Sequence, residues 1–121
     1  MHNAAFAAAG LPHLYLRYHV PPEHLPAALD EARRLDMGGL NLTVPLKEAV
    51  RPLLDAVTPE AERIGAVNTV LPENGALVGY NTDVAGFLEP LAPLLAREHL
   101  FRMARVIGAG GAETRSGGGA I

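Results

Sequence analysis

Two side chains of the sequence, Lys47 and Asp83, form a candidate acid–base pair. Each follows a predicted strand at the point where the chain turns into a predicted helix, and open α/β sheets bind ligands at such strand ends. Reduction of a ketone needs a proton at the carbonyl oxygen as hydride reaches the carbon, and a lysine ammonium can donate that proton. A nearby carboxylate would hold the ammonium in place or accept a hydrogen bond from a substrate hydroxyl. On spacing alone, a solvated strand end and a helix-capping aspartate explain the two residues about equally well.

Three polar residues near this pair could bind a ligand. Asn41 and Thr43 alternate with apolar residues over 40–44, so we expect them to meet Lys47 at the end of one strand. An amide, a hydroxyl and an ammonium together suit a polyhydroxylated carbonyl compound. Asn68 interrupts an apolar predicted strand, and a buried amide there needs partners, which either a ligand or the neighbouring backbone could supply.

A glycine-rich stretch near the end of the sequence is a weaker signal, and it would indicate a nucleotide-binding site. It follows a predicted strand over 105–108 and consists of Gly108, Ala109, Gly110, Gly111 and Ala112. Such glycines let the backbone approach a pyrophosphate at a helix N-terminus. A complete βαβ unit needs about 30 residues, and the sequence ends 13 residues after Gly108. The tail over 113–121 is expected to be flexible.

The order of the expected elements is typical of an α/β domain. Helices are expected over 1–9, 25–35, 46 to Pro52, 59–64 and from 83 onward, and strands over 14–20, 40–44, 66–71, 76–80 and 105–108. Thr58 and Pro59 resemble an N-cap followed by proline in the first helical position. Asn74 and Gly75 predict a tight hairpin. The strands at 14–20 and 40–44 flank a helix, so they are expected to be parallel.

Composition limits the classes of function. The chain has 121 residues, enough for one domain, with 49% hydrophobic and 19% charged residues. A net charge of −3 gives no field that would attract nucleic acid or an anionic membrane. The sequence has no cysteine, which favours a cytoplasmic location, and it has no apolar run near the roughly 20 residues of a membrane span. Its five histidines lack metal-ligand spacing, so no metal site is expected.

Four motifs occur in the order and rough spacing found in shikimate dehydrogenases, and the chain resembles that family from residue 1 to about 112. They are Asn41-Leu-Thr-Val-Pro-Leu-Lys47, Gly65-Ala-Val-Asn-Thr69, Asn81-Thr-Asp83 with Gly86-Phe87, and Gly108-Ala-Gly-Gly-Ala112. The start, Met1 to Phe6, resembles the first helix of the family. The resemblance implies reduction of 3-dehydroshikimate to shikimate with NADPH. Quinate/shikimate dehydrogenases share these motifs, and some use NAD, so this alternative stays open.

The resemblance also implies roles for individual residues. Lys47 would be the acid–base lysine and Asp83 its partner, while Asn41, Thr43 and Asn68 would bind the substrate. The loop from Gly108 through Ala112 would meet the phosphates of NADP.

The resemblance further predicts a fold and its division. Residues 1–103 would be a substrate-binding domain, a three-layer, mixed and mostly parallel sheet with helices on both faces, and 104–121 the remnant of an NADP-binding domain with a flexible tail. The family's first strand and its Ser-x-Ser-Pro loop precede the helix that begins at Met1, and neither occurs in this sequence. A sheet lacking an inner strand leaves two edges unpaired, which favours a homodimer or aggregation. Because the resemblance includes only the opening loop of the cofactor domain, we expect the chain alone to be inactive, and a non-catalytic substrate-binding fragment is the other interpretation.

Overall fold

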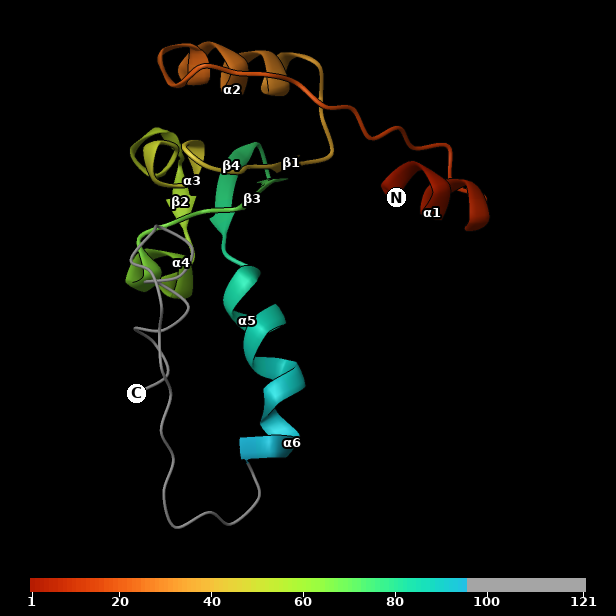
Figure 1. Ribbon diagram of the computed structural model, residues 1–121. Helices are drawn as coiled ribbons and strands as arrows, with labels where there is room; N and C mark the ends of the chain where they lie inside the picture. Colours follow the sequence, from red (N-terminus) through yellow and green to blue (C-terminus); the bar gives the residue numbers. More distant parts are fainter. Residues whose placement is uncertain (96–121) are drawn as a thin grey trace.

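The computed structural model of the chain describes residues 1–95 (Figure 1). The predicted strand over 105–108, the loop from Gly108 to Ala112, the tail over 113–121 and the proposed boundary after residue 103 all lie outside the described residues.

A four-stranded mixed sheet forms the centre of the described residues. The strands are β1 (Leu40–Asn41), β2 (Ala56–Val57), β3 (Thr69–Glu73) and β4 (Ala76–Tyr80), in the order β1-β3-β4-β2. Strand β3 is antiparallel to both β1 and β4, and β2 is parallel to β4. The mixed sheet was predicted, but the expectation of mostly parallel pairing is wrong for these strands, because a tight hairpin makes β3 and β4 antiparallel.

The β3–β4 hairpin determines which residues meet beside the sheet. Its turn residues Asn74 and Gly75 have φ values of 52° and 85°, the left-handed backbone that a two-residue hairpin turn requires. The register pairs Thr69 with Tyr80. The residues just outside this last pair, Asn68 and Asn81, are therefore brought to the same end of the hairpin.

Short helices precede, connect and follow the strands, and most of them follow the predictions. They are α1 (His2–Ala8), α2 (Leu25–Arg34), α3 (Leu46–Ala49), α4 (Pro59–Ile64), α5 (Asp83–Leu88) and α6 (Ala92–Leu95), with 3-10 turns at Pro22–His24, Arg51–Leu53 and Glu89–Leu91. The helix after Pro45 ends before Pro52, as expected, since proline removes an intrahelical donor. The cap of α4 is confirmed, because the Thr58 side chain accepts a hydrogen bond from the backbone N–H of Ala61.

The core lies between one face of the sheet and α2. Its buried side chains come from α2, the α3 region, α4, the segment before β3 and the two long strands: Leu25, Leu29, Val50, Ala61, Val67, Val70 and Leu77. On the other face of the hairpin, Leu71 and Val78 are only partly covered. Close packing explains Gly79, where an added Cβ would lie 2.6 Å from a Leu54 methyl carbon.

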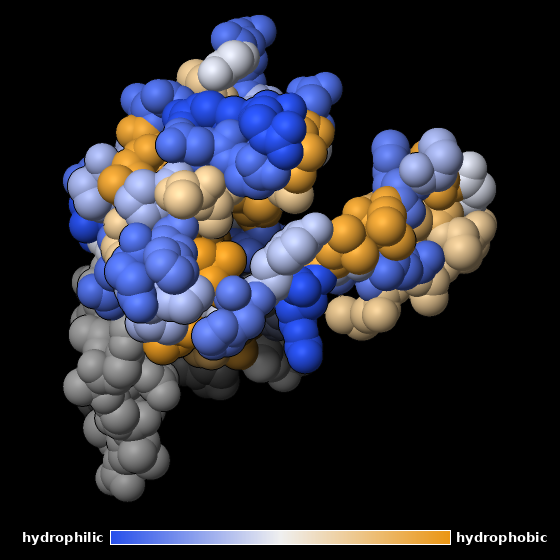
Figure 2. Space-filling model, turned by 90° about the horizontal axis from the view of Figure 1, so that it is seen from above, coloured by the Kyte–Doolittle hydropathy of each residue, from blue (hydrophilic) through white to orange (hydrophobic). Residues whose placement is uncertain are grey.

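Residues 1–20 form an arm that projects from the body of the molecule (Figure 1). The strand predicted over 14–20 is not formed, and residues 11–21 have no regular secondary structure. Leu14, Leu16 and Tyr18 are exposed, and Figure 2 shows hydrophobic surface on the arm. The expected parallel unit with 40–44 is therefore wrong, because an extended apolar segment becomes a strand only where another strand pairs with it. Among residues 1–95, no helix combines the length and apolar character that crossing a membrane would need.

Candidate active site

The side chains of Lys47 and Asp83 meet beside the sheet. Lys47 lies in the first turn of α3 and Asp83 is the first residue of α5. The Lys47 Nζ donates to Asp83 Oδ2 at 2.6 Å. The lysine side chain is 18% exposed and the aspartate side chain 44% exposed, so the lysine is mostly covered by protein while the aspartate stays accessible to solvent. The predicted proximity of two groups that lie far apart in the sequence is confirmed.

The segment that connects α4 to β3 anchors both members of the pair. The Lys47 carbonyl accepts a hydrogen bond from the backbone N–H of Val67 at 2.7 Å. On the other side, the buried Asn81 donates to the Ala66 carbonyl at 2.9 Å and accepts from the Asp83 backbone N–H at 3.0 Å. Two adjacent residues therefore fix the helix starts that carry the ammonium and the carboxylate.

Asn68 lies behind the pair, 8% exposed, and all its hydrogen-bonding positions are used. Its Nδ2 donates to Asp83 Oδ1 at 2.8 Å and to Thr82 Oγ1 at 2.9 Å. Its Oδ1 accepts from the Thr69 hydroxyl at 2.9 Å and from the Thr82 backbone N–H at 3.0 Å. The sequence left open whether a ligand or the protein supplies partners for this amide, and in the structure the protein supplies them. A ligand that bonds Asn68 must replace one of these contacts.

Asn41 joins the same group of side chains, whereas Thr43 does not. Asn41 is exposed in β1, and its Nδ2 donates to Thr69 Oγ1 at 3.2 Å. Thr43 lies in the exposed turn between β1 and α3, where its carbonyl accepts from the Leu46 backbone N–H at 2.8 Å. Its hydroxyl takes no part in the hydrogen bonds that link Asn41, Asn68 and Asp83. The other predicted site residues, Gly108 to Ala112, lie outside the described residues.

Three residues of this group were not predicted as site residues. Thr69 and Thr82 belong to the quoted motifs, so the motifs contained a signal for them. Tyr15 had none, yet its hydroxyl donates to Asn41 Oδ1 at 3.2 Å across 26 positions of the sequence.

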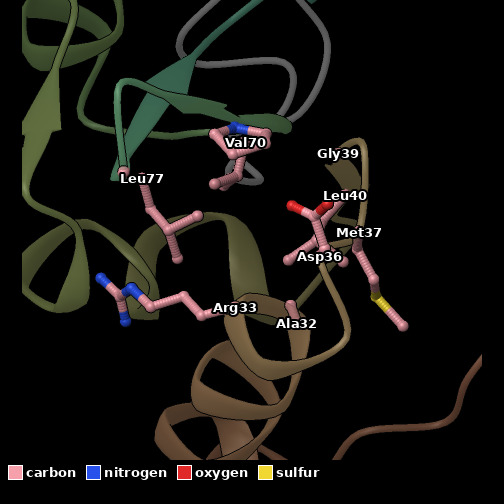
Figure 3. Close-up of a pocket in the computed structure, with 10 residues that line it drawn as sticks. Ala32, Arg33, Asp36, Met37, Gly39, Leu40, Val70 and Leu77 are labelled. Carbon is pink, nitrogen blue, oxygen red and sulfur yellow. The ribbon is translucent and has the colours of Figure 1, made fainter.

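A separate cavity of about 140 Å³ lies between the end of α2, the following turn and the hairpin (Figure 3). Its lining includes Arg33, Asp36, Met37 and Leu77, and none of the predicted site residues. The Arg33 guanidinium is already paired with Asp55 at 2.7 Å. Within the part of the chain that the structure describes, no group of histidine and carboxylate side chains is placed to hold a metal ion.

Two titratable groups outside the pair are perturbed by hydrogen bonds. The backbone N–H of Leu77 and then the guanidinium of Arg33 hold the pKa of the Asp55 carboxyl below its usual value. The Tyr80 hydroxyl donates to Glu73, whose carboxylate raises the pKa of Tyr80 above its ordinary value. Both groups stabilise the hairpin and its neighbours.

Known proteins resemble most of the length of the chain. The family model of the shikimate dehydrogenase substrate binding domain matches residues 1–70. The shikimate dehydrogenase (NADP(+)) of Citrifermentans bemidjiense is 52% identical over 112 residues, which cover 93% of this chain and 39% of that protein. The corresponding enzyme of Moorella thermoacetica is 51% identical, with 93% of this chain and 38% of that protein covered.

Solved structures of a shikimate dehydrogenase and of another reductase also resemble the chain. Shikimate 5-dehydrogenase from Thermus thermophilus, in complex with shikimate, matches with a TM-score of 0.82 at 49% identity, over 96% of this chain and 43% of that one. The ligand-free 5-ketofructose reductase of a Gluconobacter species matches with a TM-score of 0.71 at 37% identity, over 76% and 33%. The chain spans about two fifths of the length of the curated relatives it matches. It belongs to the family of shikimate dehydrogenase substrate-binding domains.

Proposed function

We propose that this chain is the substrate-binding part of an NADP-dependent shikimate dehydrogenase, which interconverts 3-dehydroshikimate and shikimate. The observation that carries the proposal is the contact of 2.6 Å between Lys47 and Asp83 on one open edge of the fold. Support for the substrate class comes from the Thermus thermophilus relative, whose structure contains shikimate.

Lys47 is the acid–base residue of the proposed reaction. In the direction of reduction its ammonium donates a proton to the carbonyl oxygen of the substrate, and in the reverse direction the amine takes the proton back. Asp83 keeps the ammonium at the open side of the site, and it accepts a hydrogen bond from a neighbouring substrate hydroxyl. Because the lysine side chain is mostly covered, its position varies less than that of a surface lysine.

Asn41 and Thr43 bind further hydroxyl groups of the substrate from the β1 side. Asn41 keeps one N–H free after donating to Thr69, and the Thr43 hydroxyl can donate or accept. Asn68 binds the substrate by exchanging its Thr82 contact, and otherwise it orients Asp83.

NADPH, when bound, supplies the hydride. The loop Gly108, Ala109, Gly110, Gly111 and Ala112 is rich in glycine, as a pyrophosphate-binding loop requires, and it lies outside the described residues. Precise placement of a reactant is worth about 7–11 kcal/mol of a reaction barrier. The chain covers about two fifths of the length of its relatives, so by itself it offers little surface to hold the nicotinamide against the substrate. The 121-residue polypeptide, assayed alone, should therefore bind the substrate without measurable 3-dehydroshikimate-dependent NADPH oxidation.

Calorimetric titration of the 121-residue chain with shikimate tests the proposal. We expect saturable binding that disappears in Lys47→Ala and in Asp83→Ala and persists in Arg63→Ala, a matched removal of an exposed cation on α4. Quinate and 5-ketofructose serve as competing ligands, because quinate/shikimate dehydrogenases and a 5-ketofructose reductase are the alternatives. Flat heats for the unmodified chain would contradict the proposed site and leave a fragment without this function.

A second readout uses Lys47 itself, which is the only lysine of the chain. Reductive methylation with a ¹³C label adds one lysine signal besides that of the N-terminus, and shikimate should shift it. We also propose a cytoplasmic location and a homodimer. Sedimentation of the purified chain tests the homodimer.

A further inference from the structure

A continuous series of side-chain hydrogen bonds leads from the Asp83 carboxylate to the arm. Asn68 donates to Asp83 at 2.8 Å, Thr69 to Asn68 at 2.9 Å, and Asn41 to Thr69 at 3.2 Å. Tyr15 then donates to Asn41 Oδ1 at 3.2 Å. We call these five residues the Asp83–Tyr15 network. It joins α5, the hairpin, β1 and the arm.

The Asp83 carboxylate and the backbone N–H of Thr82 together determine the direction of the hydrogen bonds in the Asp83–Tyr15 network. An ionised carboxylate only accepts and a backbone N–H only donates, so Asn68 must present Nδ2 to Asp83 and Oδ1 to Thr82 and Thr69. The Thr69 hydroxyl gives its one hydrogen to Asn68 and therefore accepts from Asn41. Asn41 must then turn its Nδ2 toward Thr69 and its Oδ1 away, where the Tyr15 hydroxyl donates to it. Asn41 is thereby left with its second N–H as a donor for a ligand.

The arm holds Tyr15 in the place that this direction requires. Asn3 in α1 donates to the Tyr15 carbonyl at 2.9 Å and accepts from the Tyr15 backbone N–H at 2.6 Å. The His2 ring is stacked on the Tyr15 ring, with centroids 4.3 Å apart and an interplanar angle of 28°. Backbone and ring are thus both fixed by α1, which leaves the hydroxyl as the group that faces Asn41.

We propose that Tyr15 is a positioning residue for the ligand site. Its hydroxyl locks the Asn41 amide in the orientation that offers N–H, not C=O, to the ligand. The inference rests on the proposed function for the identity of the ligand, a polyhydroxylated acid such as shikimate, but the orientation of Asn41 can be measured without any ligand.

The side-chain amide region of a ¹⁵N spectrum reports on the hydrogen bonds that hold the Asn41 amide. The chain has five asparagines and no glutamine, so this region contains five amide pairs. In Tyr15→Phe the Asn41 pair should shift, while the Asn74 pair in the hairpin turn should not. Tyr18→Phe, which changes an exposed tyrosine on the same arm, is the matched control and should leave both pairs in place. Asn3→Ala releases Tyr15 from α1 and should move the same Asn41 pair.

The affinity for shikimate should fall about two- to tenfold in Tyr15→Phe, the loss expected for one partly exposed hydrogen bond, and stay unchanged in Tyr18→Phe. An Asn41 pair that does not move in Tyr15→Phe overturns the inference whatever the titration gives. A shifted pair with unchanged affinity overturns the role of Tyr15 in binding. If the unmodified chain binds no shikimate while the pair shifts, the proposed function fails and the positioning of Asn41 stands.

Discussion

The contact between Lys47 and Asp83 should make a measurable contribution to the stability of the fold. The perturbation is a double-mutant cycle with Lys47→Met, Asp83→Asn and the double variant, which isolates the coupling between the two side chains. Fully exposed ion pairs contribute about 0.2–1 kcal/mol, and hydrogen bonds to charged groups about 1.5–3 kcal/mol. Because the lysine side chain is 18% exposed and the aspartate 44%, the expected coupling lies between these ranges, at roughly 1 kcal/mol.

Urea unfolding followed by far-UV circular dichroism provides the free energies, since the chain has no tryptophan to report by fluorescence. With a slope of about 1 kcal/mol per molar urea, a coupling of that size corresponds to a midpoint change of about 1 M. The Glu31–Arg34 pair of α2 is the matched control. Its oxygen and nitrogen lie 2.5 Å apart, but its side chains are 49% and 68% exposed, so its cycle should give a clearly smaller coupling than that of Lys47 and Asp83.

Two results would refute this reasoning. One is a coupling for Lys47 and Asp83 no larger than that of the control pair, which would mean that the contact is not maintained in solution. The other is a coupling that disappears completely in about 1 M salt, where the Debye length is about 3 Å, because a pair with a mostly covered lysine should be screened less than a surface pair.

Three further predictions concern the fold around the site. Thr58→Ala should lower the free energy of unfolding by about 1 kcal/mol, because its side chain caps α4, and Thr58→Ser should restore most of it in the same urea experiment. Gly79→Ala should cost about 1–3 kcal/mol, because its Cβ would lie 2.8 Å from a methyl carbon of Val67, whereas Gly86→Ala, with nothing within 4 Å, should cost nothing; equal melting temperatures for the two variants would contradict the packing. The pKa of Asp55 is lowered in the folded state, so its contribution is complete above its ordinary value of 3.8 and is lost as the pH falls through the folded value. Asp55→Asn should flatten the acid side of the melting temperature against pH, and an unaltered profile would argue against this role.

The local parts of the fold could be predicted from the sequence because their signals are short-range. Thr58 and Pro59 specify the start of α4, and Asn74 and Gly75 specify the hairpin, through interactions between residues at most a few positions apart. The segment over 14–20 has the composition of a strand, but composition cannot provide the neighbouring strand with which it would pair. The pairing directions of the sheet failed for a similar reason, since they depend on which edges meet.

A site residue could be predicted from the sequence where its side chain alone has a recognisable chemical role. Lys47 and Asp83 could be selected because each can move or hold a proton at a strand end, and Asn68 because an amide within an apolar strand needs partners. Thr69 and Tyr15 contribute only as links between other polar groups, and their partners lie far away in the sequence. No spacing rule identifies such links before the fold is known.

Replacing the Asp83 carboxylate by the amide of asparagine would keep the volume of the side chain but remove the negative charge that Asn68 Nδ2 faces. The backbone N–H of Thr82 can only donate, so it would still hold Asn68 in its present orientation. Through Thr69, Asn41 would then still offer an N–H to a ligand. A peptide group just before α5 thus helps to decide whether a side chain in β1, which it does not contact, meets a ligand as donor or as acceptor.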